Sequence, residues 1–329
     1  MSRSGALRWG LLGTAHINRR LIPAMRATRR SVVSAVASRT ADRAQSYAAE
    51  WQIPAAYAGY ETLLRDASID AIYVPLPNAL HVEWTLRALD AGKHVLCEKP
   101  LAATAADVDR VQAVARASQR VVAEAFMYRH EPMTSRIVEL LAANAVGRIS
   151  HIAAGFTFAQ SRDNDVRLDK ALGGGSLWDV GCYAVGIARL VAGAEPASAF
   201  GYASYGESGV DEAFTGLLRF PGDCVATIHS GFRSPYRNWL EVVGTDGRLR
   251  ADNPFRPAPR DVIEVTRGGE TERVSVEGSP LLFVRMIEDF VAAALDGRAP
   301  AVSLTDSRGN AAALAALHRA AATGQPIQL

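Results

Sequence analysis

Three side chains of this 329-residue chain stand where they could act on a substrate oxygen. The first is Lys99, which follows a short apolar run, His94–Cys97, that is typical of a buried strand. Open α/β sheets bind ligands beyond the carboxyl ends of their strands, so an ammonium group there can stabilise charge that develops on a substrate. The alternative is a solvated surface charge, which is the usual state of a lysine.

The other two are Asp179 and Tyr183, which lie four residues apart in the second half of the chain. Because residues 175–192 predict a helix, both side chains should project from one face. A phenol has an ordinary pKa of about 10, which a nearby ammonium lowers. Beside Lys99, Tyr183 could therefore exchange a proton with the substrate, while Asp179 orients a substrate hydroxyl or holds the lysine. The alternatives are a core aromatic for Tyr183 and a carboxylate at a helix start for Asp179.

The elements that must position Lys99 come from the first part of the chain. Residues 1–125 alternate short apolar runs with amphipathic, alanine-rich stretches. This alternation predicts repeated strand–helix–strand units, and so a doubly wound parallel sheet of the Rossmann type. The predicted strands are 7–13, 32–38, 71–75, 94–97 and 121–126, and the predicted helices are 42–52, 79–91 and 105–117.

A candidate phosphate-binding loop ends the first predicted strand. Residues 13–18, Gly-Thr-Ala-His-Ile-Asn, stand where a G-x-G-x-x-G loop would, with Ala15 and Asn18 in place of two glycines. The alanine adds one methyl group, and Asn18 predicts looser packing of the helix on the strand. The alternative is an ordinary turn between a strand and a helix. The residues predicted to bind a dinucleotide here are Gly13, Thr14, Ala15, His16 and Ile17.

The end of the second predicted strand bears on which dinucleotide binds. NAD enzymes usually place an acidic residue there to accept hydrogen bonds from the ribose, whereas this chain has Ser38 and Arg39. A serine and an arginine can donate to the 2′-phosphate of NADP, which a carboxylate would repel. Arg39 could equally be a solvated surface arginine, as Arg43 nearby is expected to be. We predict NADP(H) as the cofactor over NAD.

The second half of the chain has a different pattern. After a predicted helix at 131–144, strand-like runs follow one another with turn signals between them, which predicts a mostly antiparallel sheet. We therefore predict two domains, 1–125 and 126–329, with final helices at 280–296 and 305–323 that can pack back on the first domain. The predicted strands of the second half are 149–158, 197–205, 213–220, 223–230, 238–244 and 262–266.

Composition excludes several classes of function. Lys and Arg number 36 against 34 Asp and Glu, without basic blocks, which disfavours nucleic-acid and anionic-membrane partners. No metal site is predicted, because the seven histidines form no ligand pattern. There is neither an apolar leader nor a membrane span, and the three cysteines are far apart. We expect a cytoplasmic protein.

Four motifs together resemble the glucose–fructose oxidoreductase / inositol dehydrogenase (Gfo/Idh/MocA) family. They occur in the order and spacing of that family, and the resemblance runs from about Leu7 to the final helices. Tyr183 resembles the xylose dehydrogenase, dihydrodiol dehydrogenase and sugar ketoreductase branches, since the inositol branch has histidine there. The motifs are PNALH (77–81), GKHVLCEKPL (92–101), FMYRHEP (126–132) and GGGSLWDVGCY (173–183).

The resemblance implies a Rossmann domain followed by an α/β domain whose open, mostly antiparallel sheet forms a dimer or tetramer interface. It gives Lys99, Asp179 and Tyr183 catalytic roles, and it leaves open a cis Lys99–Pro100 bond. Arg129 and Arg167 are candidates for the substrate or cofactor edge, or for structural ion pairs. The further residues predicted to bind the cofactor are Leu76, Asn78, His81, Glu98 and Lys99, although His81 could instead cap its helix.

The function expected from these features is reversible hydride transfer between NADP(H) and a carbinol or keto carbon of a sugar or a cyclic diol. Aldoses such as xylose or glucose, ketosugars, nucleotide-linked deoxysugars and cyclic trans-diols all remain open as substrates. Two other functions are retained as alternatives. One is a non-catalytic, NADP-sensing regulator of the same fold, and the other is a glycosidase assisted by tightly bound NAD.

Overall fold

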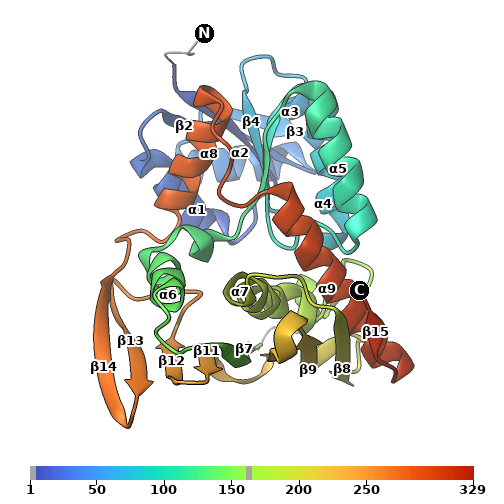
Figure 1. The fold of residues 1–329 in the computed structure, drawn as a ribbon. Helices are drawn as coiled ribbons and strands as arrows, with labels where there is room; N and C mark the ends of the chain where they lie inside the picture. The colour runs from blue at the N-terminus through green and yellow to red at the C-terminus, as the bar shows by residue number, and fades with distance from the viewer. Residues whose placement is uncertain (1–4, 161–164) are drawn as a thin grey trace. The chain divides into compact units, whose positions relative to one another are not determined.

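The computed structural model describes residues 5–160 and 165–329, which form two compact units. The first unit contains residues up to Met127 together with Phe283–Ser307, and the second contains Tyr128–Leu282 and Arg308–Leu329. The sequence placed the division after residue 125, whereas the structure also assigns the penultimate helix to the first unit. Figure 1 labels the elements of both units.

The described part of the first unit has a six-stranded sheet in the order β3-β2-β1-β4-β5-β6, with every pair parallel. The predicted doubly wound α/β fold is thereby confirmed. Strand β3 is a strand that the sequence did not predict, because its Ala-Ala-Tyr-Ala run is short and only half-buried. The strands are β1 (Leu7–Leu12), β2 (Ser31–Ser38), β3 (Ala55–Ala58), β4 (Ala71–Val74), β5 (His94–Cys97) and β6 (Val122–Glu124).

Helices connect these strands and cover the sheet. Helix α8 arrives from near the end of the chain and packs on α1 and β1, where Phe290 meets Trp9 at a ring-centroid distance of 4.9 Å. It begins at Val284, so the predicted start at Pro280 was four residues too early. The helices are α1 (Asn18–Ala27), α2 (Ala41–Trp51), α3 (Tyr60–Leu64), α4 (His81–Asp90), α5 (Ala105–Ser118) and α8 (Val284–Asp296), and η1 (Asn78–Leu80) is a short turn before α4.

The described part of the second unit has a nine-stranded sheet in the order β14-β13-β12-β11-β7-β10-β9-β8-β15. All neighbours are antiparallel except β7 and β10, which confirms the mostly antiparallel sheet. Strands β12, β14 and β15 were not predicted. The strands are β7 (Ile149–Ala159), β8 (Ser198–Tyr205), β9 (Asp211–Arg219), β10 (Val225–Gly231), β11 (Arg233–Gly244), β12 (Gly247–Asp252), β13 (Arg260–Arg267), β14 (Glu270–Glu277) and β15 (Ile327–Gln328).

One face of this sheet is covered and the other is open. Helix α7 (Cys182–Ala192), which is buried along most of its length, packs on β7 and β10, and α6 (Pro132–Ala142) contacts β14. Figure 1 shows both helices on the same side of the sheet. Along β9, buried Phe214 and Leu218 alternate with exposed Leu217, as expected for a sheet with one solvated face. The last helix, α9 (Leu304–Thr323), enters the second unit at Arg308.

Candidate functional site

The loop after β1 presents backbone N–H groups at the start of α1. Gly13 has a φ of 99°, a left-handed conformation that favours glycine, and its amide donates to the carbonyl of Ala37 on β2. The backbone amides of the next four residues, 14–17, have no hydrogen-bond acceptor within the described residues. Consecutive open amides at a helix start can donate hydrogen bonds to an anion such as a pyrophosphate.

The side chain of Asn18 bonds back to the first residue of this loop. This side chain is fully buried, and its Nδ2 donates to the carbonyl oxygen of Gly13 over 3.0 Å. The amide side chain thus replaces a missing glycine with a hydrogen bond across the turn, and the looser helix–strand packing predicted from Asn18 stays a prediction. Ala15 is half-buried within the loop, and the imidazole of His16 is exposed.

A cluster of two arginines lies beside this loop, one directly after β2 and one in the first turn of α2. Arg39 is exposed directly after β2, next to the buried Ser38. Arg43, from the first turn of α2, donates from Nε to Oγ1 of Thr14 over 2.7 Å. Both guanidinium groups act on Tyr60, whose pKa is raised by burial and lowered in part by these charges. The sequence signal that could have identified Arg43 is its position four residues after Arg39, in the same positively charged turn.

Leu76 and His81 occupy the segment after β4. Leu76 lies against Gly13, since a methyl group added to that glycine would be 3.4 Å from Cδ2 of Leu76. His81 is completely buried, and its two ring nitrogens each lie 2.7 Å from a carbonyl oxygen, Nδ1 from Pro100 and Nε2 from Leu76. The structure thus places His81 as a bridge between the segments after β4 and β5. Asn78 begins the η1 turn and is half-buried.

The segment that carries Lys99 is tied down on both sides. The Lys99–Pro100 peptide is cis, and the lysine is half-buried. Glu98 accepts a 2.6 Å hydrogen bond from the hydroxyl of Tyr73 and a 3.3 Å bond from the amide of Lys99. On the far side, the amide of Leu101 donates to the buried carboxylate of Glu124 over 2.9 Å. These contacts fix the backbone from which the Lys99 ammonium extends.

In the second unit, Asp179 is paired with Arg167. Nε of the arginine donates to Oδ2 of the aspartate over 2.6 Å, and its Nη1 lies 3.1 Å from Oδ1 of Asp165. The guanidinium therefore bridges two carboxylates, and the pKa of Arg167 is raised, first by the charge of Asp179. The Asp179 side chain is 13% exposed, against 39% for Arg167. Arg167 was a candidate either for the substrate or cofactor edge or for an ion pair, and the structure shows it in an ion pair with Asp179 of the predicted catalytic segment.

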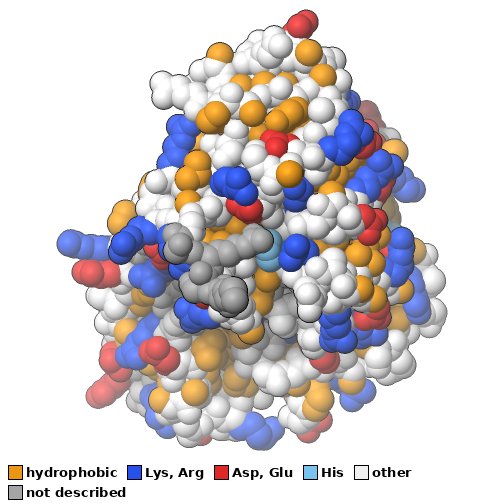
Figure 2. Space-filling model, turned by 90° about the horizontal axis from the view of Figure 1, so that it is seen from above, with side chains coloured by type: hydrophobic (Ala, Val, Ile, Leu, Met, Phe, Trp, Pro, Cys, Tyr) orange, Lys and Arg blue, Asp and Glu red, His pale blue; other side chains and the backbone are white. Residues whose placement is uncertain are grey.

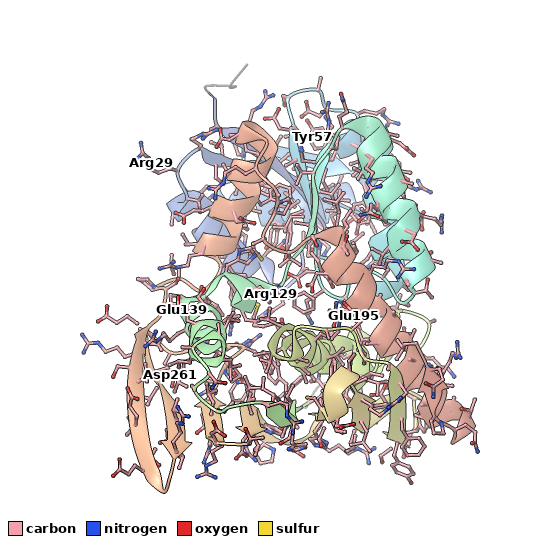
Figure 3. All side chains as sticks on the ribbon, viewed as in Figure 1. Arg29, Tyr57, Arg129, Glu139, Glu195 and Asp261 are labelled. Carbon is pink, nitrogen blue, oxygen red and sulfur yellow. The ribbon has the colours of Figure 1, made fainter. Side chains whose placement is uncertain are left out.

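Tyr183 lies in an aromatic cluster at the start of α7. It is 4% exposed, and its ring centroid is 5.4–5.7 Å from those of Phe255, Phe156 and Tyr128. The cluster holds the ring and keeps water from its faces. The other candidate, Arg129, belongs to the η2 turn (Met127–His130) and is half-buried, and Figure 3 labels it on the segment ahead of α6.

The segment that carries Asp179 and Tyr183 is not the single helix that the sequence predicts. Residues Leu177–Gly181 form a π-helical turn, and the α-helix begins only at Cys182. The inserted turn widens the spacing of side chains, so that a separation of four residues no longer means one α-helical face. π-Helical turns are frequent at functional sites.

The described residues show neither a metal-binding cluster nor a membrane-spanning helix. Across residues 5–160 and 165–329, no group of three or more His, Cys, Asp or Glu side chains could hold a metal ion. No helix in the same residues is long and apolar enough to cross a membrane. On the face drawn in Figure 2, acidic and basic side chains are interspersed, which matches the balanced composition.

Comparison with known proteins covers both units. The model of the oxidoreductase family GFO/IDH/MocA, NAD-binding Rossmann fold, matches residues 7–126, and that of the GFO/IDH/MocA C-terminal domain matches residues 134–250. D-xylose 1-dehydrogenase (NADP(+)) 2 of Haloferax volcanii is 37% identical over 98% of this chain and 99% of its own length. The dTDP-3,4-didehydro-2,6-dideoxy-alpha-D-glucose 3-reductase of Saccharopolyspora spinosa is also 37% identical, over 82% of each chain.

Among solved structures, a 3-ketoreductase from Actinomadura kijaniata, in complex with NADP and TDP-benzene, is similar over almost the whole chain. The TM-score is 0.92 at 32% identity, covering 96% of this chain and 98% of the other. The likeness therefore extends to both sheets and to the segments that carry the candidate residues.

Proposed function

Because the chain belongs to the GFO/IDH/MocA family of oxidoreductases, as its motifs predicted, we propose that it transfers a hydride between NADP(H) and a carbinol or keto carbon of a sugar. The observation that carries this proposal is the loop of open amides at residues 14–17 with two arginines beside it. Such a loop fits a pyrophosphate, and the arginines fit the additional phosphate that distinguishes NADP from NAD. Two relatives support this assignment: the name of the xylose dehydrogenase of Haloferax volcanii includes NADP(+), and the structure of the ketoreductase of Actinomadura kijaniata is a complex with NADP.

The residues at the carboxyl ends of the strands fit the rest of the cofactor. Gly13 and Leu76 give an apolar wall beside the phosphate loop, and Ser38 and Arg39 follow β2, where the adenosine ribose of a dinucleotide lies in Rossmann domains. His81 and Glu98 hold the segments after β4 and β5, so their contribution to binding is to keep Asn78 and Lys99 in place. When bound, NADP(H) supplies or accepts the hydride.

In this proposal, Lys99 stabilises the reacting oxygen and Tyr183 transfers the proton. The ammonium of Lys99 donates a hydrogen bond to the oxygen on the reacting carbon and stabilises the negative charge that forms there. The hydroxyl of Tyr183 gives its proton to that oxygen during reduction, and the resulting phenolate takes a proton from the substrate hydroxyl during oxidation. Asp179, held by Arg167, orients a neighbouring hydroxyl of the sugar. The aromatic cluster around Tyr183 limits access of water to the proton donor.

A coenzyme-dependence assay tests the proposal. Nicotinamide absorbance is followed with NADP⁺ or NAD⁺ against D-xylose, D-glucose and a cyclic trans-diol, starting with D-xylose because of the relative that oxidises it. We expect turnover that depends on added cofactor and favours NADP⁺. Tight NADPH binding without turnover of any substrate in the panel would support the regulatory alternative instead. Hydrolysis of a glycoside without added cofactor would support the glycosidase alternative.

We propose in addition that the open face of the second sheet binds a second copy of this chain. Exposed apolar side chains lie close together on that face, with Phe200 of β8 opposite Leu217 of β9 and Tyr202 two residues further along β8. Of these, Tyr202 is 76% exposed, which is unusual for a large aromatic side chain. Light scattering should give the mass of a dimer or tetramer, and Leu217→Arg should lower it. A monomeric wild-type chain at micromolar concentration would contradict this.

A further inference from the structure

A buried carboxylate lies behind the segment that carries Asp179 and Tyr183. Asp211, the first residue of β9, is 4% exposed. Its Oδ2 accepts two hydrogen bonds of 2.8 Å, one from Oγ of Ser176 and one from the backbone amide of Leu177. These donors are the residue before the π-helical turn and the first residue within it. The aspartate thus caps the start of the turn from a strand that is 34 residues distant in the chain.

The same network reaches the other end of the turn through Ser230 on β10. The Oγ atoms of Ser176 and Ser230 lie 3.0 Å apart. Gly181, the last residue of the turn, packs on the same serine, since a methyl group added to this glycine would be 3.2 Å from Oγ of Ser230. Both ends of the turn are therefore held on neighbouring strands, with Asp179 between them.

The glycine before Ser176 leaves room for the carboxylate. Gly175 has a φ of 120°, which side chains of L-residues rarely adopt, and a Cβ atom at this position would overlap Oδ1 of Asp211. Its carbonyl accepts a 3.0 Å hydrogen bond from the amide of Asp179. A glycine here therefore admits the carboxylate on one side and begins the turn on the other.

Burial makes the charged form of Asp211 energetically unfavourable, which indicates that the carboxylate has a structural role. Burial raises the pKa of its carboxyl, while the hydrogen bonds from Ser176 and Leu177 and the nearby charge of His318 on α9 act in the opposite direction. His318 itself packs on Trp178 of the turn, at a ring-centroid distance of 5.8 Å. A buried carboxylate with few ionic partners lowers the stability of the fold unless its hydrogen bonds compensate for the lost hydration.

We propose that Asp211 is a positioning residue for hydride transfer. Through Ser176 and Leu177 it holds the π-helical turn, and so sets the placement of Asp179 within the turn and of Tyr183 two residues after it. This inference rests on the proposed oxidoreductase function for its kinetic consequence, but not for its structural one. Displacements of about 1 Å in a catalytic group can lower turnover on the order of a hundred-fold.

The experiment compares Asp211→Asn with the wild-type chain, using D-xylose and NADP⁺. The amide keeps the shape of the side chain but removes the charge and one acceptor. We expect kcat to fall roughly ten- to a hundred-fold, with the KM for D-xylose and the Kd for NADPH each changed less than about threefold. Hydrogen exchange of the Leu177 and Asp179 amides should speed up in the same variant, and this measurement needs no turnover.

Two further variants make the outcome specific. Ser176→Ala removes one of the two donors to Asp211 and should lower kcat by a smaller factor. In the double variant, kcat should fall by less than the product of the two single factors, because both side chains act through one network. Thr157→Val is the matched control: it removes a buried hydrogen bond from the same sheet, to the carbonyl of Pro235, outside this network. It should keep the wild-type kcat and the exchange rates at residues 177–183.

Wild-type kcat in a folded Asp211→Asn chain would overturn the proposal, as would a loss of kcat with unchanged exchange at Leu177. If Asp211→Asn does not fold, Ser176→Ala decides the question by the same two measurements. If the wild-type chain turns over no sugar, the proposed function fails. Exchange at Leu177 then still shows whether Asp211 holds the turn.

Discussion

Arg167 donates from Nε to Oδ2 of Asp179 over 2.6 Å, while its Nη1 contacts Asp165. The aspartate expected to orient a substrate hydroxyl is therefore itself oriented by an arginine. We expect Arg167→Met to lower kcat/KM by on the order of tenfold or more, because Asp179 then loses its charged partner. Arg167→Lys should recover only part of the loss, since one ammonium cannot match the planar geometry of two donor groups. Steady-state kinetics on D-xylose measure both, and equal activity of Met and wild type would show that the pair is dispensable.

Arg39 and Arg43 should determine the preference for NADP over NAD. Removing both guanidinium groups in Arg39→Ala/Arg43→Ala should raise the KM for NADP⁺ roughly tenfold or more, with little change for NAD⁺, which lacks the 2′-phosphate. The preference for NADP⁺ over NAD⁺ that remains in this variant should also depend less on ionic strength than that of the wild type. The matched control is Arg19→Ala, on the exposed side of α1, where the arginine pairs with Glu50 at 3.6 Å. An unchanged NADP⁺/NAD⁺ ratio in the double variant would place the 2′-phosphate elsewhere.

Lys99→Met and Tyr183→Phe should each abolish turnover and leave NADPH binding intact. Methionine keeps most of the length of the lysine but lacks the ammonium, and phenylalanine keeps the ring in its aromatic cluster but lacks the hydroxyl. NADPH fluorescence titration and a stopped-flow assay separate binding from chemistry. Tyr57→Phe serves as control, because that hydroxyl bonds to Asp66 at the edge of the first sheet; Figure 3 labels Tyr57. Full activity in either catalytic variant would disprove the proton-transfer scheme.

His81 should make the first unit less stable in mild acid. Burial has the largest effect and lowers the pKa of His81 below the ordinary value of 6.5. Hydrogen bonds with the carbonyl groups of Pro100 and Leu76 raise this pKa in part, and the charge of Lys99 lowers it further. Above pH 6.5 the imidazole is neutral in both the folded and unfolded chain, whereas below it the unfolded chain binds a proton that the folded chain does not. The free energy of unfolding should therefore fall as pH drops below 6.5, until the pKa of the folded state is passed.

Urea denaturation between pH 7.5 and pH 5 measures this slope, in the wild type and in His81→Gln. The glutamine variant is expected to be less stable at every pH, because it loses the bridge between Leu76 and Pro100, but its slope should be smaller. His229, whose pKa burial also lowers, contributes to the slope that remains. An identical slope in both chains would mean that His81 does not titrate differently on folding.

Much of this protein could be predicted from local patterns. The alternation of apolar runs and amphipathic stretches gave five of the six strands of the first sheet, because the period of side-chain burial depends on a few consecutive residues. The motifs around Lys99 and Tyr183 identified the family for the same reason, since each is a short run whose residue types are visible together. Two of the strands that were missed, β3 and β15, are short and gain their pairing from neighbours rather than from their own pattern.

The tertiary structure alone decided which side chains support that machinery. Asn18 bonds back across its own loop, Arg43 reaches Thr14 from the next helix, and Asp211 caps a turn 34 residues before it. None of these pairings has a local signature, because each depends on how strands and helices that are distant in sequence come together. The sequence by itself predicted the residues that are proposed to meet the substrate. The buried hydrogen bonds that hold them, and the π-helical turn that changes their spacing, arise only when the sheets have formed.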